Sequence, residues 1–155
     1  VSCTHKNKIF RSFRLVRSWI LFTLNSYFLT MNSLHISPTF KTPEIQMEAG
    51  TGILKITGRV FPENPKEFFT PVIAWITEYA KAPAAHTSLI LNLSYFNSSS
   101  NEYIFRCCKM VEAIGEAGAI AGIVWEYEAE DEDMRQMGDD FKELLKINFE
   151  IKAVH

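Results

Sequence analysis

The sequence predicts one α/β domain whose mixed β-sheet begins with an antiparallel hairpin and continues with parallel central strands connected by about three helices. Apolar segments of strand length alternate with segments whose apolar residues recur at helical spacing, which is typical of parallel strands joined by crossover helices. Before these come three short extended segments at 34–36, 45–47 and 53–60. Gly50 and Gly52 separate the last two, and glycines at that position favour a hairpin turn.

The first helix is predicted from a start signal at Asn64 and Pro65. Asparagine is a favoured N-cap, proline fits the first helical position, and Glu67 is placed to reach back to the cap. We expect this helix to end near Pro83. Its predicted inner face consists of Phe68, Val72, Trp75, Ile76 and Tyr79.

The remaining elements follow in alternation. Residues 87–95 are a dense apolar run that predicts a strand covered on both faces, and 120–127 and 148–153 predict two more strands. The inner stripes of the second and third helices are Ile104, Cys107, Cys108, Val111 and Ile114, and Met134, Met137, Phe141 and Leu145. On the third helix Gly138 would permit close contact with the sheet, because it has no side chain.

Composition restricts the class of ligand. The 155 residues are 47% hydrophobic with a net charge of -2, which suits a single domain with one core. Residues 1–30 contain five basic residues and no acid, which leaves 11 basic and 18 acidic residues from Met31 onward. Nucleic-acid binding depends on clustered Lys and Arg, so this acidic balance argues against a nucleic-acid partner.

Residues 1–30 require a separate interpretation. We expect them to be a non-native or disordered N-terminal extension, with Met31 as the natural start and 31–155 as the single folded domain. The alternative is a membrane-surface helix that places Trp19, Ile20, Leu21 and Phe22 against lipid. The apolar run at 19–29 is too short to span a bilayer as a helix, so no stable membrane insertion is expected.

The cysteines and histidines do not predict a disulfide framework or a metal site. Cys107 and Cys108 are neighbours, the third cysteine is distant in sequence, and no CxxC spacing is present. The four histidines are widely spread. We therefore expect a cytoplasmic protein without a metal or cofactor.

The serine run between the strand at 87–95 and the second helix is the most informative segment. Ser99 and Glu102 fit a capping box, which would leave Ser98 just outside the helix with its hydroxyl facing solvent. A phosphate there would meet unpaired backbone N–H groups and the positive end of the helix dipole. The alternative is that these serines only cap the helix. Nucleophilic catalysis is not predicted, because the segment has no histidine base, GxSxG elbow or SxxK pattern.

Clustered carboxylates at the predicted start of the third helix suggest a second kind of site. Four acids stand together here, namely Glu130, Asp131, Glu132 and Asp133. They could bind a divalent cation in a small metal-assisted hydrolase, but their spacing does not match an EF-hand loop. Acids in a first turn also complement the helix dipole without binding anything.

Aromatic residues flank the serine run. Tyr95 and Phe96 precede it, and Tyr103 and Phe105 follow it. We expect most of them to lie in the core, although aromatic residues are also enriched at the centres of interfaces. A purely structural interaction module that uses its edge strands is a further alternative.

Four separated motifs carry a resemblance to a known family. They lie at residues 31–36 with 42–45, at 58–65, at 93–100, and at 125–127 with 131–134 and Gly138. Together and in this order they are similar to the SiaC family of bacterial regulatory phosphoproteins. The similarity runs from Met31 to about Val154, and residues 1–30 have no counterpart in it.

The resemblance implies a fold, a modified residue and partners. The fold would be similar to STAS domains and anti-sigma-factor antagonists. The family's acceptor threonine falls on Ser98, with Ser99 and Ser100 as alternatives, and a kinase and a PP2C-type phosphatase would act on it. The unphosphorylated form would bind a signalling enzyme such as a diguanylate cyclase, and the chain would not itself be an enzyme. The expected partner-binding residues are Tyr95, Phe96, Asn97, Ser98, Ser99 and Ser100.

Overall fold

The computed structural model describes residues 31–155, and these form a six-stranded mixed sheet with three helices. The predictions made for residues 1–30 lie outside the described residues. The strands are β1 (Leu34–Ile36), β2 (Glu44–Glu48), β3 (Ile53–Val60), β4 (His86–Phe96), β5 (Ile120–Glu128) and β6 (Asn148–Val154). The helices are α2 (Pro65–Tyr79), α3 (Ser98–Glu116) and α4 (Glu132–Leu144).

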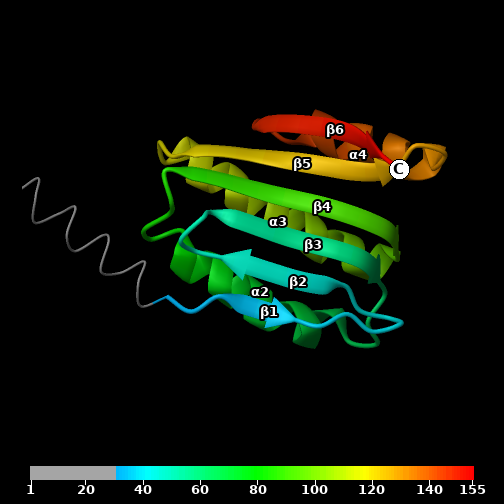
Figure 1. The fold of residues 1–155 in the computed structure, drawn as a ribbon, viewed down its shortest axis with the longest axis horizontal. Helices are drawn as coiled ribbons and strands as arrows, with labels where there is room; N and C mark the ends of the chain where they lie inside the picture. Colours follow the sequence, from blue (N-terminus) through cyan, green and yellow to red (C-terminus); the bar gives the residue numbers. More distant parts are fainter. Residues whose placement is uncertain (1–30) are drawn as a thin grey trace, which may run out of the picture. The chain divides into compact units, whose positions relative to one another are not determined.

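The strands lie in the sheet in the order in which they occur in the chain (Figure 1). β1, β2 and β3 pair antiparallel, whereas β3, β4, β5 and β6 pair parallel. Each parallel connection contains one helix, as a crossover between parallel strands requires. The predicted α/β fold with a hairpin, parallel strands and three helices is therefore confirmed.

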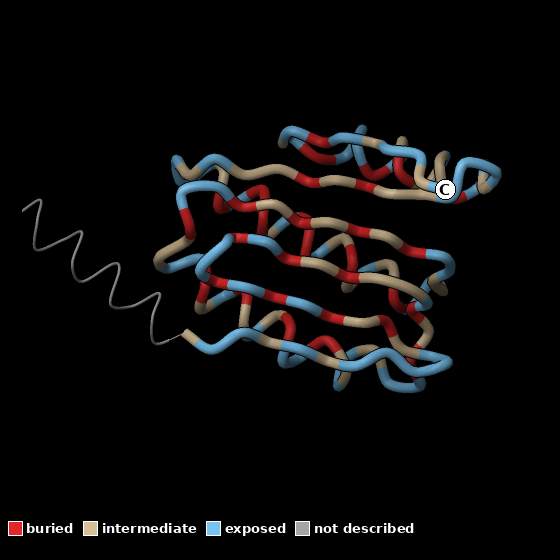
Figure 2. The backbone as a smooth tube through the Cα atoms, viewed as in Figure 1, coloured by how far each residue is buried: buried red, intermediate tan, exposed pale blue. Residues whose placement is uncertain are grey.

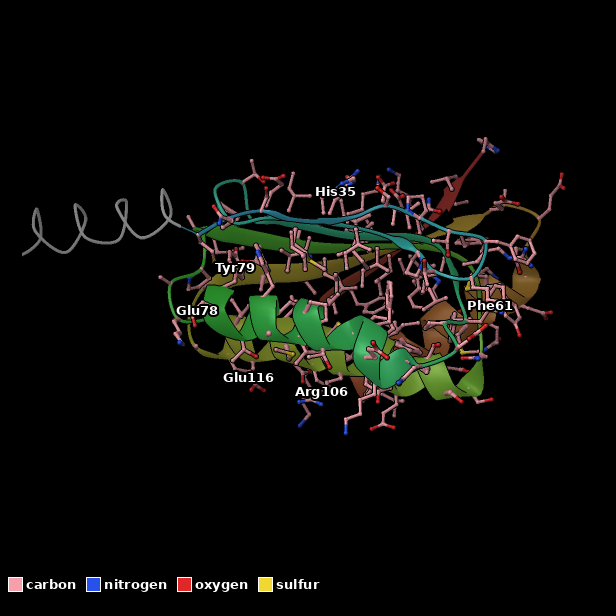
Figure 3. The ribbon with its side chains drawn as sticks, turned by 90° about the horizontal axis from the view of Figure 1, so that it is seen from below. His35, Phe61, Glu78, Tyr79, Arg106 and Glu116 are labelled. Atoms are coloured by element: carbon pink, nitrogen blue, oxygen red, sulfur yellow. The ribbon has the colours of Figure 1, made fainter. Side chains whose placement is uncertain are left out.

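All three helices cover the same face of the sheet, as Figures 1 and 3 show. Along β4, Leu89, Leu91 and Leu93 are buried under the helices, while Ile90 and Asn92 alternate with them and stay partly exposed. The prediction that this strand is covered on both faces is wrong. Only alternate residues belong to the core, so the sheet keeps one open face.

The turn between β2 and β3 depends on Gly52. Any other residue at this position would be strained. Gly52 has φ of 71°, and its backbone N–H donates to the Glu48 carbonyl at 3.0 Å. Its own carbonyl accepts from the Ser88 N–H at 2.9 Å. A Cβ at this position would lie 2.0 Å from the carbonyl oxygen of His86. The hairpin is thus held directly against the beginning of β4.

The start of α2 agrees with its predicted signal, but two residues of its predicted inner face, Phe68 and Trp75, are only partly buried. Asn64 Oδ1 accepts from the Glu67 N–H at 3.2 Å, and Asn64 Nδ2 donates to the Glu67 carboxylate at 3.2 Å. The buried aromatic of the first turns is Phe69 and not Phe68. The reason is contact with α3, because the Phe69 ring stacks on Tyr103 with the centroids 5.4 Å apart.

The core lies between the sheet and the helices, where buried residues line both layers (Figure 2). Trp125 on β5 is fully buried, and its ring centroid lies 5.1 Å from that of Phe141. Its Nε1–H donates to the Met134 carbonyl at 3.0 Å. A Cβ on Gly138 would lie 2.7 Å from Trp125 Cδ1. The predicted close contact of helix and sheet at Gly138 is therefore confirmed.

The predicted inner stripe of α3 is buried as expected, and its residues serve as packing residues of the core. Burial raises the pKa of the Cys107 thiol to about 12 and that of Cys108 well above its ordinary value. Both thiols are therefore unreactive at neutral pH, because the thiolate is the reactive form. One charged residue shares this buried side: Glu112 bonds to Lys109 and to the backbone N–H of Lys146, which lower its pKa.

Candidate functional site

The candidate site lies where the carboxyl ends of β3 and β4 meet the first turn of α3. Val60 and Phe96, the last residues of these two strands, face each other in the parallel register. Just beyond them, the N–H of Asn97 donates to the Val60 carbonyl at 3.3 Å. Loops at the carboxyl ends of parallel strands are where open α/β sheets place their binding residues.

Asn97 is the residue that caps α3. It has an extended backbone with φ of -95° and ψ of 168°, and its Oδ1 accepts from the Ser100 N–H at 2.9 Å. Ser98 is consequently the first residue of the helix, and the predicted capping box of Ser99 and Glu102 is wrong. The physical reason is that the chain makes its turn from strand to helix at Asn97, and asparagine is as good an N-cap as serine.

The three serines of the run differ in exposure. Ser98 and Ser99 are exposed, whereas Ser100 is fully buried and its Oγ has no hydrogen-bond partner among the described residues. A modifying enzyme can therefore reach the first two but not Ser100. The N–H groups of a helix's first turn have no partner within the helix, and the positive end of the dipole lies there, so both exposed hydroxyls stand where an added anion is stabilised.

We expect Asn97→Ala to lower the free energy of unfolding by about 1 kcal/mol, because it removes the cap of α3. Urea denaturation of the full chain measures this change. Ser99→Ala is the matched control, since Ser99 is exposed and forms no capping bond, and it should leave the stability nearly unchanged. Equal losses in the two variants would contradict the assignment of the cap.

An aromatic cluster formed by Phe40, Phe61 and Tyr95 lies at the end of β4, the strand that leads into Ser98. The Phe61 ring packs edge-on against Phe40 and Tyr95, with centroid distances of 6.0 Å and 5.5 Å. Phe40 is 74% exposed and Tyr95 is 48% exposed. Figure 3 places Phe61 at the end of the domain opposite Tyr79. The cluster is thus an apolar surface at the same end of the domain as the start of α3.

The guanidinium of Arg59 lies over this cluster. Its Cζ is 5.1 Å from the centroid of the Phe40 ring and 5.4 Å from that of the Phe61 ring. Arg59 faces Tyr95 across the β3–β4 register. The aromatic cluster at the end of β4 therefore carries the positive charge of Arg59.

The predicted partner-binding residues do not all share this surface. Tyr95 belongs to the aromatic cluster, and Ser98 and Ser99 are exposed beside it. Phe96 instead packs toward the core, 6.2 Å from Trp125 and 6.4 Å from Phe141 between ring centroids. The side chain of Asn97 is used by the helix cap, and Ser100 is buried, so these two do not offer side chains to a partner.

The acidic cluster is not assembled as a metal centre. Together with Glu128, the four acids of the cluster line a shallow surface depression. They are Glu130, Asp131, Glu132 and Asp133. Asp131 Oδ1 caps α4 by accepting from the Met134 N–H at 2.9 Å, and Glu132 pairs with Arg135. Within residues 31–155 no group of three or more His, Cys, Asp or Glu side chains is arranged to hold a metal ion. The geometry gives the metal-assisted alternative no support.

Comparison with known proteins identifies the family. The family model described as "SiaC family regulatory phosphoprotein" matches residues 36–154. The chain belongs to the SiaC family. It is also 30% identical over 123 residues to an uncharacterized protein of Pseudomonas aeruginosa strain UCBPP-PA14, and the match covers 79% of this chain and 98% of that protein.

Two crystal structures of SiaC from Pseudomonas aeruginosa have the same fold. Apo-SiaC superimposes with a TM-score of 0.74 at 29% identity, covering 79% of this chain and 100% of that chain. The other structure is the diguanylate cyclase SiaD in complex with its activator SiaC. There the TM-score is 0.74 at 30% identity, with 78% of this chain and 99% of that chain covered.

Three of the four motifs that carried the SiaC-family resemblance lie at one edge of the sheet. Residues 58–65 span the end of β3, 93–100 the end of β4, and 125–127 with 131–134 the end of β5. Because these strands are parallel neighbours, their carboxyl ends lie side by side. These three motifs are therefore gathered at the edge that carries Ser98.

Three residues of this surface were missed by sequence reasoning, namely Phe40, Phe61 and Arg59. Phe40 lies in a loop rich in Ser, Pro and Thr, where an aromatic residue has no turn-forming role, and this was the one available signal. Arg59 and Phe61 belong to a family motif, but only the strand register shows that they reach Tyr95.

No helix in the described part of the chain is long and apolar enough to cross a membrane.

Proposed function

We propose that this chain is a regulatory phosphoprotein of a partner switch, which binds a signalling enzyme such as a diguanylate cyclase while Ser98 carries a free hydroxyl. One observation carries the proposal: in a chain of the SiaC family, Ser98 is exposed in the first turn of α3, at the same end of the domain as an exposed aromatic cluster. The chain acts by binding and not by catalysis. The SiaC complex with the cyclase SiaD supports this choice of partner.

Reversible phosphorylation sets the state of the switch. A cognate protein kinase transfers the γ-phosphoryl group of ATP to Ser98 Oγ, and a PP2C-type phosphatase hydrolyses the ester and returns inorganic phosphate. The exposure of Ser98 supports access by both enzymes, and its place at the positive end of α3 supports a phosphate there without refolding. Serine in place of the family's threonine keeps the acceptor hydroxyl.

The charge of the phosphate supplies the mechanism of release. Phosphorylation adds about -1.5 to -2 charges at a surface whose exposed groups include aromatic rings and Arg59. An apolar or acidic partner surface that fits the unmodified site would then face added negative charge. Desolvation and like-charge repulsion disfavour such a contact, so the complex dissociates.

Two measurements test the proposal. Intact mass spectrometry of the chain from its native host should detect a phosphorylated form that disappears in Ser98→Ala and persists in Ser99→Ala. Calorimetric titration with the purified diguanylate cyclase of the same host should show binding by the unmodified chain, and phosphoserine at position 98 should weaken it by about tenfold or more. Phosphoserine is preferred to aspartate, which imitates a phosphate incompletely.

Ser98→Ala is the control for the binding experiment, because it removes the hydroxyl without adding charge. It should bind the cyclase as tightly as the unmodified chain does. If a phosphorylated mass persists in Ser98→Ala, a residue other than Ser98 accepts the phosphate. Equal affinity with and without phosphoserine would favour a purely structural interaction module over the switch.

A further inference from the structure

Arg59 holds a charge that no carboxylate neutralises. Within residues 31–155 its guanidinium contacts the Phe40 and Phe61 rings and forms no ion pair. By contrast, Arg135 on α4 pairs with both Glu132 and Asp139. An arginine held only by exposed rings is available to a stronger anionic partner, because a cation–π contact at an exposed site is weaker than a charge-assisted bidentate bond.

The backbone places Arg59 close to Ser98. Arg59 precedes Val60, whose carbonyl accepts from the N–H of Asn97, and Ser98 follows Asn97 directly. The β3–β4 register shifts between Gly58 and Arg59. Such an irregularity re-aims the side chains next to it, and it occurs here at the end of the strand. One backbone hydrogen bond, from Asn97 to Val60, therefore joins the segment that carries Ser98 to the strand end that carries Arg59.

The rings that hold Arg59 are themselves anchored. Lys41, next to Phe40, forms an ion pair with Glu63 at 2.7 Å, and the Lys41 carbonyl accepts from the Phe61 N–H at 2.9 Å. These contacts fix the loop after β1 against the loop after β3. The guanidinium can leave the rings without dismantling the loops, because neither contact depends on it.

We propose that Arg59 is the residue that binds the phosphate on Ser98, and that phosphorylation transfers its guanidinium from the Phe40 and Phe61 rings to the phosphate. This inference rests on the proposed function and adds its local mechanism. In the unmodified chain the partner meets an aromatic surface covered by a cation. In the modified chain the cation is withdrawn and the rings are uncovered, so both charge and shape change together. Bidentate pairing with phosphate is the geometry that arginine favours.

Phosphorus NMR of the full chain with genetically encoded phosphoserine at position 98 tests the inference without any kinase or partner. An arginine bound to the phosphate lowers its second pKa below the ordinary value of about 6, because it favours the dianion. Arg59→Gln should raise that pKa by about half a unit or more. In the same samples, the Arg59 Nε–H resonance should shift when the unmodified and phosphorylated chains are compared.

Arg106→Gln is the matched control. Arg106 is an exposed arginine on α3, two turns beyond Ser98, and it forms no ion pair among the described residues. Figure 3 shows it on the helix side of the domain, away from Phe61. Its substitution removes the same charge and should leave the phosphate pKa unchanged. If Arg59→Gln leaves that pKa unchanged, or Arg106→Gln moves it equally, the inference is overturned, whereas the mass and calorimetric tests of Ser98 are unaffected.

Discussion

Trp125→Ala is expected to lower the free energy of unfolding by about 3–5 kcal/mol, a large part of the stability of a small domain. Trp125 is fully buried on β5, and its ring contacts those of Phe96, Phe141 and Phe149. Its Nε1–H also satisfies the carbonyl of Met134. The substitution leaves a cavity between the sheet and α4 and removes the hydrogen bond to the Met134 carbonyl, and both effects add to the loss.

Guanidinium denaturation followed by circular dichroism measures this loss. Trp75→Ala is the control, because Trp75 is only partly buried on α2, although it also stacks on a neighbour and donates to a backbone carbonyl. It should cost clearly less than the substitution at Trp125. If the two variants lost equal stability, burial would not be the cause, and the assignment of Trp125 to the centre of the core would fail.

Gly52→Ala is the second substitution with a large expected effect, about 2–4 kcal/mol of unfolding free energy. The residue has φ of 71°, which side chains rarely adopt, and a Cβ would lie 2.0 Å from the backbone carbonyl of His86. A backbone atom cannot move aside as a flexible side chain can. Relief of the clash would therefore separate the hairpin from the start of β4 and weaken the hydrogen bond between Ser88 and Gly52.

Gly50→Ala is the matched control. It tests whether the loss of stability comes from the position of Gly52 or from replacing any glycine of this turn with alanine. Gly50 lies in the same turn, has a negative φ, and has open space where its Cβ would be. Thermal unfolding of both variants should show a large fall in Tm for Gly52→Ala and little change for Gly50→Ala. Similar Tm values in the two variants would contradict the close approach of Gly52 to His86.

Hydrophobic periodicity predicted the elements well because each strand and helix here presents one consistent face. The sequence-based prediction failed where two nearby residues fit the same helical stripe or the same capping position. Phe68 and Phe69 are both apolar and lie four and three residues before Val72, so either fits the helical stripe, and only the stacking on Tyr103 decides between them. At the start of α3, Asn97 and Ser99 are both good caps, and the backbone turn chooses Asn97.

The candidate site was only partly predictable for a related reason. Ser98 could be singled out because it is local to one strand-to-helix junction, and its exposure agrees with that choice. Arg59 and Phe40 are about 40 and 60 residues away in sequence from Ser98, and strand register and loop packing bring them to the cluster at the end of β4. Contacts between distant segments leave no periodic trace in a single sequence, whereas the family motifs mark the general region.

The agreement between strand order in the sheet and strand order in the chain also determines how the domain can assemble. Each strand pairs with the strand made just before it, so no strand has to be inserted between two that have already joined. The segment that must be closed at each step is one turn or one crossover, and short closures cost little entropy. A nascent chain can thus add its strands one by one at a single growing edge.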